Sequence, residues 1–471
     1  MTLVMKFGGT SVGSAEAMRQ TAELIEKFKA DWGSVVVVAS AMGSKPVKVT
    51  DLLLNGSQAA LKGDLAEVET LLPKLRAIHF DAIEGLVPAG DKQDALKVEI
   101  DGFLTHYGNM CQAISFLGEI SPRASDAIGG MGEQMSIRIL AAYMSERGTP
   151  AEAIDATELI VTDDNFTSAT PLVEQTNDQT AARLLPLIES GVTPIVTGFI
   201  AATADGVTTT LGRGGSDYSG SLIGRAIHAA EVWIWTDVDG VMSTDPRMVP
   251  DARTIPELTY REVSELAFYG AKVLHPRTMR PVMESGIPLR IKNTFNPEHP
   301  GTVILKERDI AGGNIRAVTA IRELSLITVE GRGMLGIPGV AARTFKAVAD
   351  TKASVLLITQ SSSEQSICFA VPQSYALEIT HALESEFSTE LKIRDIDRIF
   401  SHDDVAIITV VGAGMQGTPG VSGRFLGALG ESRVNIIAIA QGSSECSISA
   451  VVRGSEVETG IQYIHKMIVN Q

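Results

Sequence analysis

The chain has 471 residues, a formal net charge of −16 at pH 7, 44% hydrophobic residues and three cysteines. This length fits roughly three domains of about 150 residues each, with ample apolar content for their cores. The acidic charge argues against nucleic acid or an anionic membrane surface as the main partner, because either would need a basic face. Cys111, Cys368 and Cys446 have neither C-x-x-C spacing nor clustered histidines, which argues against a disulfide framework or a structural zinc site. With no signal-like N-terminus and no apolar run of about 18 residues, the chain is expected to be soluble and cytoplasmic.

The N-terminal stretch predicts the start of an α/β domain. An apolar run over Thr2–Phe7 ends in the glycine turn Gly8-Gly9-Thr10-Ser11, and apolar residues then recur at helical spacing over 14–29. The next run, SVVVVASA over 34–41, is typical of a strand buried on both faces of a parallel sheet. Lys6 ends the first strand just before a helix N-terminus, where a phosphate could bind. A tight turn with a solvated lysine is the alternative, and the Walker A pattern is absent.

The rest of this first part predicts a helical excursion and then a return to the sheet. Residues 51–120 show helical periodicity without strand-like runs. Further strands are expected at 150–161, 194–200, 206–211 and 231–236, with a helix at 218–230 and a closing segment near residue 305. This pattern predicts an α/β fold with a mainly parallel sheet sandwiched by helices.

A glycine-rich stretch, LGRGGSDY over 211–218, lies between a predicted strand and a predicted helix. Arg213 and Asp217 are therefore expected at the carboxyl end of a parallel strand, where open α/β sheets bind ligands. A guanidinium matches a carboxylate or a phosphate, and a purely structural turn would not need both charged residues. The stretch predicts a binding site.

Two later stretches carry further polar groups. WTDVDGVMSTDPR over 235–247 begins like a calcium loop, but its glycine comes too early and no glutamate follows at the required distance, so calcium is rejected. Thr236 and Asp237 end a predicted strand, and Arg247 lies far enough along the chain to return to a bound phosphate. FYGAKVLHP over 268–276 places Lys272 just beyond a helix, with a solvated surface lysine as the alternative.

The last third of the chain contains one unit written twice. ITVEGRGMLGIPGV begins at Ile327 and ITVVGAGMQGTPGV begins at Ile408, 81 residues later, and matching residues continue in the same order. Each copy predicts strand, glycine loop, helix, strand, strand and helix. The second loop has the dinucleotide spacing G-x-G-x-x-G, but a Pro-Gly pair separates its last glycine from the helix and the unit is too small. A dehydrogenase is therefore rejected.

The two copies differ at their ends. The first copy is followed by a predicted strand at 392–399, whereas the second stops at its helix. The segment 314–321 repeats the Ile-Arg pair and the final Ile of that strand at equal spacing. We infer that this segment supplies the missing strand of the second copy, so that the first copy is inserted in the second. The expected domains are 1–305, 324–401, and 313–322 joined with 402–471.

Four motifs followed by duplicated units resemble the aspartate kinases of the amino-acid kinase family. The motifs are KFGGTSVGS, LGRGGSDYSG, WTDVDGVMSTDPR and FYGAKVLHP, and the resemblance covers essentially the whole chain. It implies an amino-acid kinase fold followed by two ferredoxin-like ACT domains. It also implies phosphorylation of the side-chain carboxylate of L-aspartate by ATP with Mg²⁺, giving 4-phospho-L-aspartate, the first step toward lysine, threonine and methionine. No homoserine dehydrogenase domain follows the repeats, so a monofunctional kinase is expected.

The resemblance also implies roles for individual residues. Lys6 is the expected cation at the transferring phosphoryl group, and Asp217 organises the lysine and the substrate. The residues implied for L-aspartate are Ser40, Ala41, Thr50, Glu133, Arg213, Gly214 and Ser216, with Arg213 at the α-carboxylate and Glu133 at the α-ammonium. The residues implied for the nucleotide are Gly8, Gly9, Ser11, Thr236, Asp237, Met242, Arg247 and Lys272. Met242 departs from the family, in which many members have tyrosine, and no protein ligand of the Mg²⁺ ion is implied.

The ACT pair implies feedback control by an end-product amino acid, bound at an interface between such domains. The implied effector-binding residues are Met334, Gly336, Pro338, Gly339, Val355, Leu356 and Gln360. Lysine-sensitive relatives often carry an acidic side chain near the position of Leu356, and its absence favours threonine. ACT sheets usually pair between chains, which implies a homodimer or a homotetramer.

Two alternatives stay open on the sequence alone. The first is another kinase of the same fold, acting on acetylglutamate, glutamate, carbamate or a nucleoside monophosphate, which the GRGGSD motif and the ACT tail disfavour. The second is an amino-acid-binding regulatory protein with an inactive kinase domain, which the intact Lys6, Arg213 and Asp217 disfavour.

Overall fold

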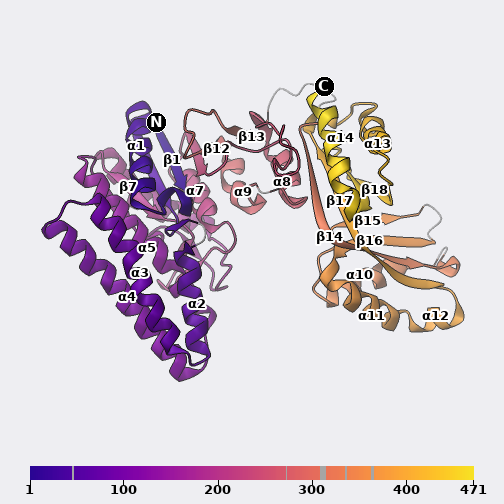
Figure 1. Cartoon of the computed structure of the whole chain (residues 1–471), viewed down its shortest axis with the longest axis horizontal. Helices are drawn as coiled ribbons and strands as arrows, with labels where there is room; N and C mark the ends of the chain where they lie inside the picture. The colour runs from indigo at the N-terminus through magenta and orange to yellow at the C-terminus, as the bar shows by residue number, and fades with distance from the viewer. Residues whose placement is uncertain (45–46, 272, 308–314, 335–336, 362–364, 471) are drawn as a thin grey trace. The chain divides into compact units, whose positions relative to one another are not determined.

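A computed structural model describes residues 1–44, 47–271, 273–307, 315–334, 337–361 and 365–470 (Figure 1). The chain forms two compact units whose segments alternate along the sequence. The first unit comprises Met1–Val241, Pro256–Tyr260 and Leu274–Arg308, and the second comprises Met242–Ile255, Arg261–Val273 and Asp309–Gln471. Among the helices in these described ranges, none is long and apolar enough to cross a membrane.

The first unit is built on an eight-stranded sheet in the order β11-β13-β12-β10-β1-β2-β7-β5. Its strands are β1 (Thr2–Phe7), β2 (Ser34–Ala39), β5 (Ala151–Ile154), β7 (Thr193–Thr197), β10 (Glu231–Thr236), β11 (Glu257–Thr259), β12 (Leu289–Asn293) and β13 (Thr302–Leu305). Neighbouring strands are parallel except for the β12–β13 pair. After their first residue, β1 and β2 are buried throughout, as expected for central strands of a parallel sheet covered on both faces. The prediction of a mainly parallel sheet is confirmed.

Two smaller sheets lie beside the main one. The strands β3 (Gly43–Ser44) and β4 (Val47–Lys48) form a pair, and β6 (Val161–Thr162), β8 (Ile200–Thr203) and β9 (Thr208–Thr210) form a sheet in that order. The sequence predicts a parallel strand before the LGRGGSDY stretch, and this prediction is wrong. The strand found there does not belong to the main sheet. It is β9, which pairs antiparallel with β8, because residues 200–210 fold into a local hairpin.

Helices surround the main sheet of the first unit. They are α1 (Ala15–Trp32), α2 (Val49–Leu61), α3 (Leu65–Leu86), α4 (Asp91–Leu117), α5 (Pro122–Glu146), α6 (Val173–Glu189), α7 (Gly215–Ala226) and α9 (Pro276–Ser285). The helical excursion predicted at 51–120 is confirmed as the helices α2 to α4, which pack together with α5 (Figure 1). Two serines begin helices as N-caps: Ser14 accepts from the amide of Ala17 in α1, and Ser121 accepts from that of Ala124 in α5.

The second unit contains one antiparallel sheet of six strands in the order β15-β16-β14-β17-β19-β18. The strands are β14 (Ala317–Glu330), β15 (Leu357–Gln360), β16 (Ser366–Pro372), β17 (Arg398–Val411), β18 (Ala438–Gln441) and β19 (Ser447–Arg453). The helices are α8 (Tyr260–Phe268), α10 (Val340–Asp350), α11 (Ala376–Glu386), α12 (Ser388–Ile393), α13 (Val421–Glu431) and α14 (Val457–Val469). Each copy of the repeat thus follows the predicted order of strand, helix, strand, strand and helix.

The two copies share the long central strands β14 and β17. Residues 317–321 of β14 pair with 407–411, whereas 324–330 pair with β16 on one side and with 398–405 on the other. Val318 packs in the core of the second copy with Ile408 and Phe425. This pairing supports the proposal that the first copy is inserted in the second.

One predicted strand is partly wrong. Lys392 and Ile393, the start of the strand predicted at 392–399, end helix α12 instead. Arg394 closes this helix in a left-handed conformation with φ of 61°, and the strand begins only at Arg398. The domain boundary predicted at residue 305 stays a prediction. Residues 242–255 and 261–273 precede this boundary in the sequence but belong to the second unit.

Candidate active site

A cavity of about 670 Å³ in the first unit gathers most of the predicted catalytic and substrate-binding residues. Its lining comprises Lys6, Lys48, Thr50, Asp51, Glu133, Phe199, Gly212, Arg213, Gly214, Gly215, Ser216 and Asp217. These residues come from the end of β1, from β4 and the start of α2, from the middle of α5, from the turn between β7 and β8, and from the N-terminus of α7 with the turn before it. The cavity thus lies where the carboxyl end of a central parallel strand meets a helix N-terminus, which is a ligand-binding position in α/β folds.

Lys6 and Asp217 form an ion pair inside this cavity. The Nζ atom of Lys6, near the carboxyl end of β1, lies 2.6 Å from Oδ1 of Asp217, in the first turn of α7. Gly220 lets α7 pack closely against Lys6, because a Cβ at this position would lie 3.3 Å from Cβ of Lys6. The carboxylate holds the ammonium in a fixed position, and its own charge is favourable at a helix N-terminus.

The turn before α7 depends on glycine. Gly212 and Gly214 have φ of 72° and 73°, in the left-handed region that glycine adopts without strain. Gly214 is the N-cap of α7, so the free amides of the first helical turn are directed toward the cavity. This end of the helix is suited to an anionic group.

Glu133 is a buried carboxyl group beside the same cavity. Its residue is 4% exposed, and its Oε2 atom has no hydrogen-bond partner in the described part of the chain. Burial raises the pKa of Glu133 to about 8, although backbone hydrogen bonds at Ala41 and Glu133 and the charge of Lys6 act in the opposite direction. An unsatisfied buried carboxyl group that lines a cavity is arranged to receive a ligand group.

Arg213 supplies the opposite charge. Its side chain is exposed at the cavity, and it makes no hydrogen bond or ion pair with the residues that the structure describes. Besides Lys48 and Asp51, the cavity therefore presents a guanidinium and a buried carboxyl oxygen that have no hydrogen-bond partner among the described residues. A zwitterionic amino acid carries the two complementary charges on a single carbon atom.

Ser40 and Ala41 lie behind Glu133 and do not line the cavity. The hydroxyl of Ser136, on α5, donates to the carbonyl oxygen of Ser40 at 2.7 Å. A Cβ at Gly132 would lie 2.7 Å from Cβ of Ala41, so this segment packs directly on the helix. Their role in aspartate binding stays a prediction, and the structure places them as supports of Glu133.

Several cavity residues were missed by the sequence analysis, namely Lys48, Asp51, Phe199, Gly212 and Gly215. Lys48 and Asp51 flank the predicted Thr50, so their position along the chain was a usable signal. Phe199 has a φ of 70°, which is unusual for an aromatic residue, and it packs against Gly215. Nothing in the local sequence indicates this conformation, because it results from the tight turn between β7 and β8.

The predicted phosphate-binding residues Gly8, Gly9 and Ser11 differ in how close they lie to the ion pair and in how deeply they are buried. Gly8 lies next to the ion pair, since a Cβ there would lie 3.8 Å from Nζ of Lys6. Gly9 packs against the carbonyl oxygen of Ala41, where a Cβ would lie at 2.9 Å. Ser11 is fully buried: its hydroxyl bonds Thr294 at 2.8 Å, and its amide donates to Gly8. Direct phosphate binding by Ser11 therefore has no support from this geometry and stays a prediction.

The remaining nucleotide residues are divided between the units. Thr236 and Asp237 lie at the end of β10 in the first unit, with 3.2 Å between Thr236 Oγ1 and Asp237 Oδ1. Met242 and Arg247 belong to the second unit, where Met242 pairs with Thr254 and Arg247 forms an ion pair with Asp245. Lys272 lies outside the described residues. Their assembly into one nucleotide site stays a prediction.

The predicted effector residues lie in the first copy of the repeat. Met334 is buried in its core, and Val355 packs against the same core. Pro338 and Gly339 precede α10 and are exposed, Leu356 is half-buried, and Gln360 is exposed at the end of β15. Gly336 lies outside the described residues. These positions stay predictions for effector binding.

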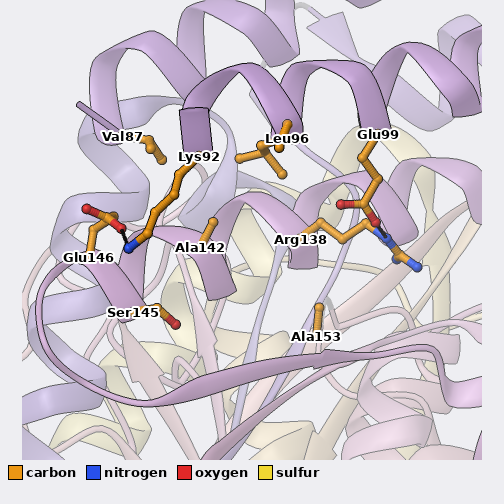
Figure 2. A pocket seen from close by; sticks show the side chains of 10 residues that line it. Val87, Lys92, Leu96, Glu99, Arg138, Ala142, Ser145, Glu146 and Ala153 are labelled. Carbon is orange, nitrogen blue, oxygen red and sulfur yellow. Dashed lines mark hydrogen bonds and ion pairs between the residues drawn. The ribbon is translucent and has the colours of Figure 1, made fainter. Parts of the chain in front are cut away.

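A second cavity of about 450 Å³ lies between α4 and α5 (Figure 2). Its charged residues neutralise one another, with Lys92 bonded to Glu146 at 2.5 Å and Arg138 bonded to Glu99 at 2.6 Å. No lining side chain is an unpartnered buried polar group among the described residues. The first cavity is therefore the candidate active site.

Comparison with known protein families accounts for both parts of the chain. The model of the amino acid kinase family matches residues 1–293, and the ACT domain model matches 327–387 and again 408–468. The family match covers more than half of the chain and includes the whole lining of the candidate active site. The chain therefore belongs to the amino acid kinase family.

The curated relatives and solved structures that resemble this chain are aspartokinases. The bifunctional aspartokinase/homoserine dehydrogenase of Haemophilus influenzae is 35% identical over 99% of this chain, which spans only 56% of that protein. Aspartokinase 1, chloroplastic, of Arabidopsis thaliana is 34% identical over 99% of this chain, and the match spans 80% of that protein. Aspartokinase III of E. coli, solved with aspartate and ADP and also with lysine and aspartate, is 31% identical, with 99% coverage of both chains and a TM-score of 0.79. Within the family, the chain falls among the aspartokinases.

Proposed function

We propose that this protein transfers the γ-phosphoryl group of ATP to the side-chain carboxylate of L-aspartate, giving 4-phospho-L-aspartate. The observation that supports this most directly is the candidate active site. It combines the Lys6–Asp217 ion pair with an unpaired Arg213 and a buried Glu133. Aspartate and ADP occupy E. coli aspartokinase III, which has the same fold over 99% of this chain.

The chemistry needs charge neutralisation more than proton transfer. A free side-chain carboxylate has a pKa near 4 and is ionised at neutral pH, so this nucleophile requires no general base. Both reactants are anionic, and catalysis depends on their alignment and on positive charge at the transferring group. Lys6 supplies that charge. Asp217 keeps the ammonium in place and accepts no proton.

Arg213 and Glu133 select the acceptor. Arg213 binds the α-carboxylate of aspartate, since a guanidinium pairs well with a planar carboxylate. Glu133 binds the α-ammonium and must be ionised to do so. Because the pKa of Glu133 is raised to about 8, binding of the ammonium draws the proton off this carboxyl group. Thr50, Gly214 and Ser216 complete the cavity wall around the acceptor.

ATP enters with Mg²⁺ as its companion. In the ranges that the structure describes, no group of three or more His, Cys, Asp or Glu side chains is placed to hold a metal ion. The ion is proposed to keep the phosphate oxygens and water as its main ligands. When bound, the ion neutralises phosphate charge. The protein contributes Lys6, the glycines Gly8 and Gly9, and the amides at the start of α7.

The tandem ACT domains are proposed to bind an end-product amino acid and to control the kinase by feedback. Lysine is bound in one structure of E. coli aspartokinase III. The residue near the effector in the first copy is Leu356, which does not complement an ammonium group, and threonine stays our predicted effector. Pairing of ACT sheets between chains is proposed to give a homodimer or homotetramer. The cytoplasmic location, the monofunctional organisation and the place of the reaction ahead of lysine, threonine and methionine likewise stay predictions.

The activity is tested by trapping the acyl phosphate with hydroxylamine. L-Aspartate, L-glutamate and N-acetylglutamate are each offered with Mg-ATP, with and without threonine or lysine. Turnover with aspartate alone is expected, and suppression by threonine identifies the effector. Turnover with another acceptor refutes the assignment, and effector binding without any turnover identifies a regulatory protein instead.

A variant test addresses the acceptor site directly. Glu133→Ala should raise the KM for L-aspartate far more than the KM for ATP. The matched control is Asp155→Asn, because Asp155 also contacts α5, through Gln134 and Arg138, but does not line the cavity. Equal effects of Glu133→Ala on both substrates would contradict the assignment of Glu133.

A further inference from the structure

Asp126, on α5, is a buried carboxylate outside the candidate active site. It is 2% exposed and does not line the cavity. It accepts three hydrogen bonds: from Thr210 Oγ1 at 2.7 Å, from the amide of Thr210 at 3.0 Å and from the amide of Thr167 at 2.8 Å. A buried carboxyl group that is held by three donors outside the active site calls for an explanation.

The helix that carries Asp126 also carries Glu133. The two residues are seven positions apart, which is about two turns, so both side chains leave the same face of α5. The partner Thr210 ends β9, and Arg213 follows it three residues later in the same turn. Asp126 therefore connects the helix of the acidic acceptor residue to the segment of the basic one.

The second partner of Asp126 supports the same turn from outside. Thr167 has a φ of 70°, a strained conformation for a β-branched residue, and its amide is held by Asp126. The space for a Cβ at Gly212 lies 3.3 Å from both the carbonyl oxygen of Thr167 and Oγ of Ser168. The amide of Ala169 also donates to the carbonyl oxygen of Thr210 at 2.9 Å, so a shift of residues 167–169 would disturb the turn that carries Arg213.

We propose that Asp126 is a positioning residue for acceptor recognition, which sets the distance between Arg213 and Glu133 across the cavity. This inference rests on the proposed function, in which those two residues bind the α-carboxylate and the α-ammonium of one amino acid. Both groups are attached to the same carbon atom, so their binding tolerates little displacement. A carboxylate suits the task because its Oδ2 atom accepts from both backbone amides while its Oδ1 atom accepts from the Thr210 hydroxyl.

The test compares Asp126→Ala, which removes all three acceptor contacts, with a weaker change at its partner. Asp126→Ala should raise the KM for L-aspartate by about tenfold or more, with the KM for ATP and kcat within about twofold of wild type. Thr210→Val removes only the hydroxyl bond and should raise the KM for aspartate by about three- to tenfold. Thr210→Ser keeps the hydroxyl and should stay within about twofold of wild type. Asp155→Asn, which breaks a carboxylate network elsewhere on α5, is the control for general loosening.

A second measurement reports on the hydrogen bonds between Asp126 and Thr210 directly. Hydrogen exchange of the peptide that covers 206–214 should be faster in Asp126→Ala and Thr210→Val than in wild type and Asp155→Asn. Parallel increases in both KM values, or an unchanged KM for aspartate with faster exchange, would overturn the positioning role. If Asp126→Ala does not fold, the Thr210→Val and Thr210→Ser pair decides the question with the same readouts.

The outcome also separates this inference from the proposed function. A folded wild-type protein that does not phosphorylate aspartate refutes the function alone. The positioning role is then judged by calorimetric titration with the same three amino acids. Weaker binding to Asp126→Ala than to wild type supports the role, and equal titrations overturn it.

Discussion

The proposed acceptor site should give the KM for L-aspartate a pH dependence that originates at Glu133. Burial raises the pKa of this carboxyl group to about 8 in the ligand-free protein. At neutral pH most molecules therefore hold Glu133 protonated, and only the ionised fraction is ready to bind an α-ammonium group. The acceptor must supply the free energy that removes the proton.

The size of the effect follows from the ionised fraction. With a pKa of about 8, this fraction falls about tenfold for each pH unit well below that value. The apparent KM for aspartate should therefore rise by about 25-fold as the pH is lowered from about 8.5 to about 6.5. The side-chain carboxylate of aspartate stays ionised over this range, so the acceptor itself does not produce the trend.

The assay is hydroxylamine trapping across this pH range, with wild type and Glu133→Gln compared at saturating Mg-ATP. Glutamine keeps the volume and removes the ionisation, so its KM for aspartate should be higher at every pH and nearly independent of pH. The KM for ATP serves as the internal control in both proteins. An equal pH slope in wild type and Glu133→Gln would refute the argument.

The same pKa should also appear in the stability of the protein without substrate. The folded protein keeps a proton on Glu133 between its ordinary value of 4.5 and about 8, and the unfolded chain releases it. The stabilisation is thus fully present below about pH 4.5 and is lost as the pH rises to about 8, by about 5 kcal/mol in total. Urea unfolding of wild type should show this loss relative to Glu133→Gln; parallel curves for the two proteins would show that burial does not shift the group.

Three further predictions test other parts of the first unit. Lys6→Met should lower kcat by about 10²- to 10³-fold with a small change in the KM for aspartate, and steady-state kinetics with kcat within about threefold would contradict it. Burial lowers the pKa of His79 to about 4, so stability should fall as the pH drops from about 6.5 to about 4, and His79→Gln should remove that slope in urea unfolding. Gly132→Ala should cost about 1–3 kcal/mol of stability and raise the KM for aspartate, because the new methyl group would lie 2.7 Å from Cβ of Ala41. Gly102→Ala, on α4 with open space around it, is the matched control and should unfold at or above the wild-type temperature.

The fold was predictable where local pattern and tertiary environment agree. The run over 34–39 is apolar on both faces and became the central strand β2, and the helical period over 51–120 became α2 to α4. The strand predicted at 392–399 failed because its Ile-Arg spacing repeats that of 314–321 without sharing its environment. The segment begins inside α12, and pairing with β14 starts only at Arg398.

The candidate site was predictable as a set of residues but not as an arrangement. Lys6 and Asp217 were both indicated by their glycine-rich surroundings, whereas their 2.6 Å contact depends on how closely α7 packs on β1. Ser11 shows the opposite outcome. Its place in a glycine turn suggests a hydrogen-bond donor to phosphate, yet its hydroxyl is hydrogen-bonded to that of Thr294, which is distant in sequence. Burial and partner choice are tertiary properties, and they explain why Asp126 and Phe199 gave no local signal.

The unpaired polar groups of the cavity account for the proposed selectivity. Lys6 has its counter-charge in Asp217, so the transferring group meets a cation that is already held in place. Arg213 makes no ion pair within the described residues, Glu133 keeps one buried oxygen without a hydrogen bond, and the hydrogen bonds of Asp126 set their mutual placement. An N-acetylated acceptor brings no ammonium group, so it leaves Glu133 protonated and its buried oxygen unsatisfied, which costs about 1–3 kcal/mol relative to a free amino acid. Glutamate brings both charges but places its side-chain carboxylate one methylene further from them, out of alignment with Lys6. The same two residues thus reject one competitor by charge and the other by length.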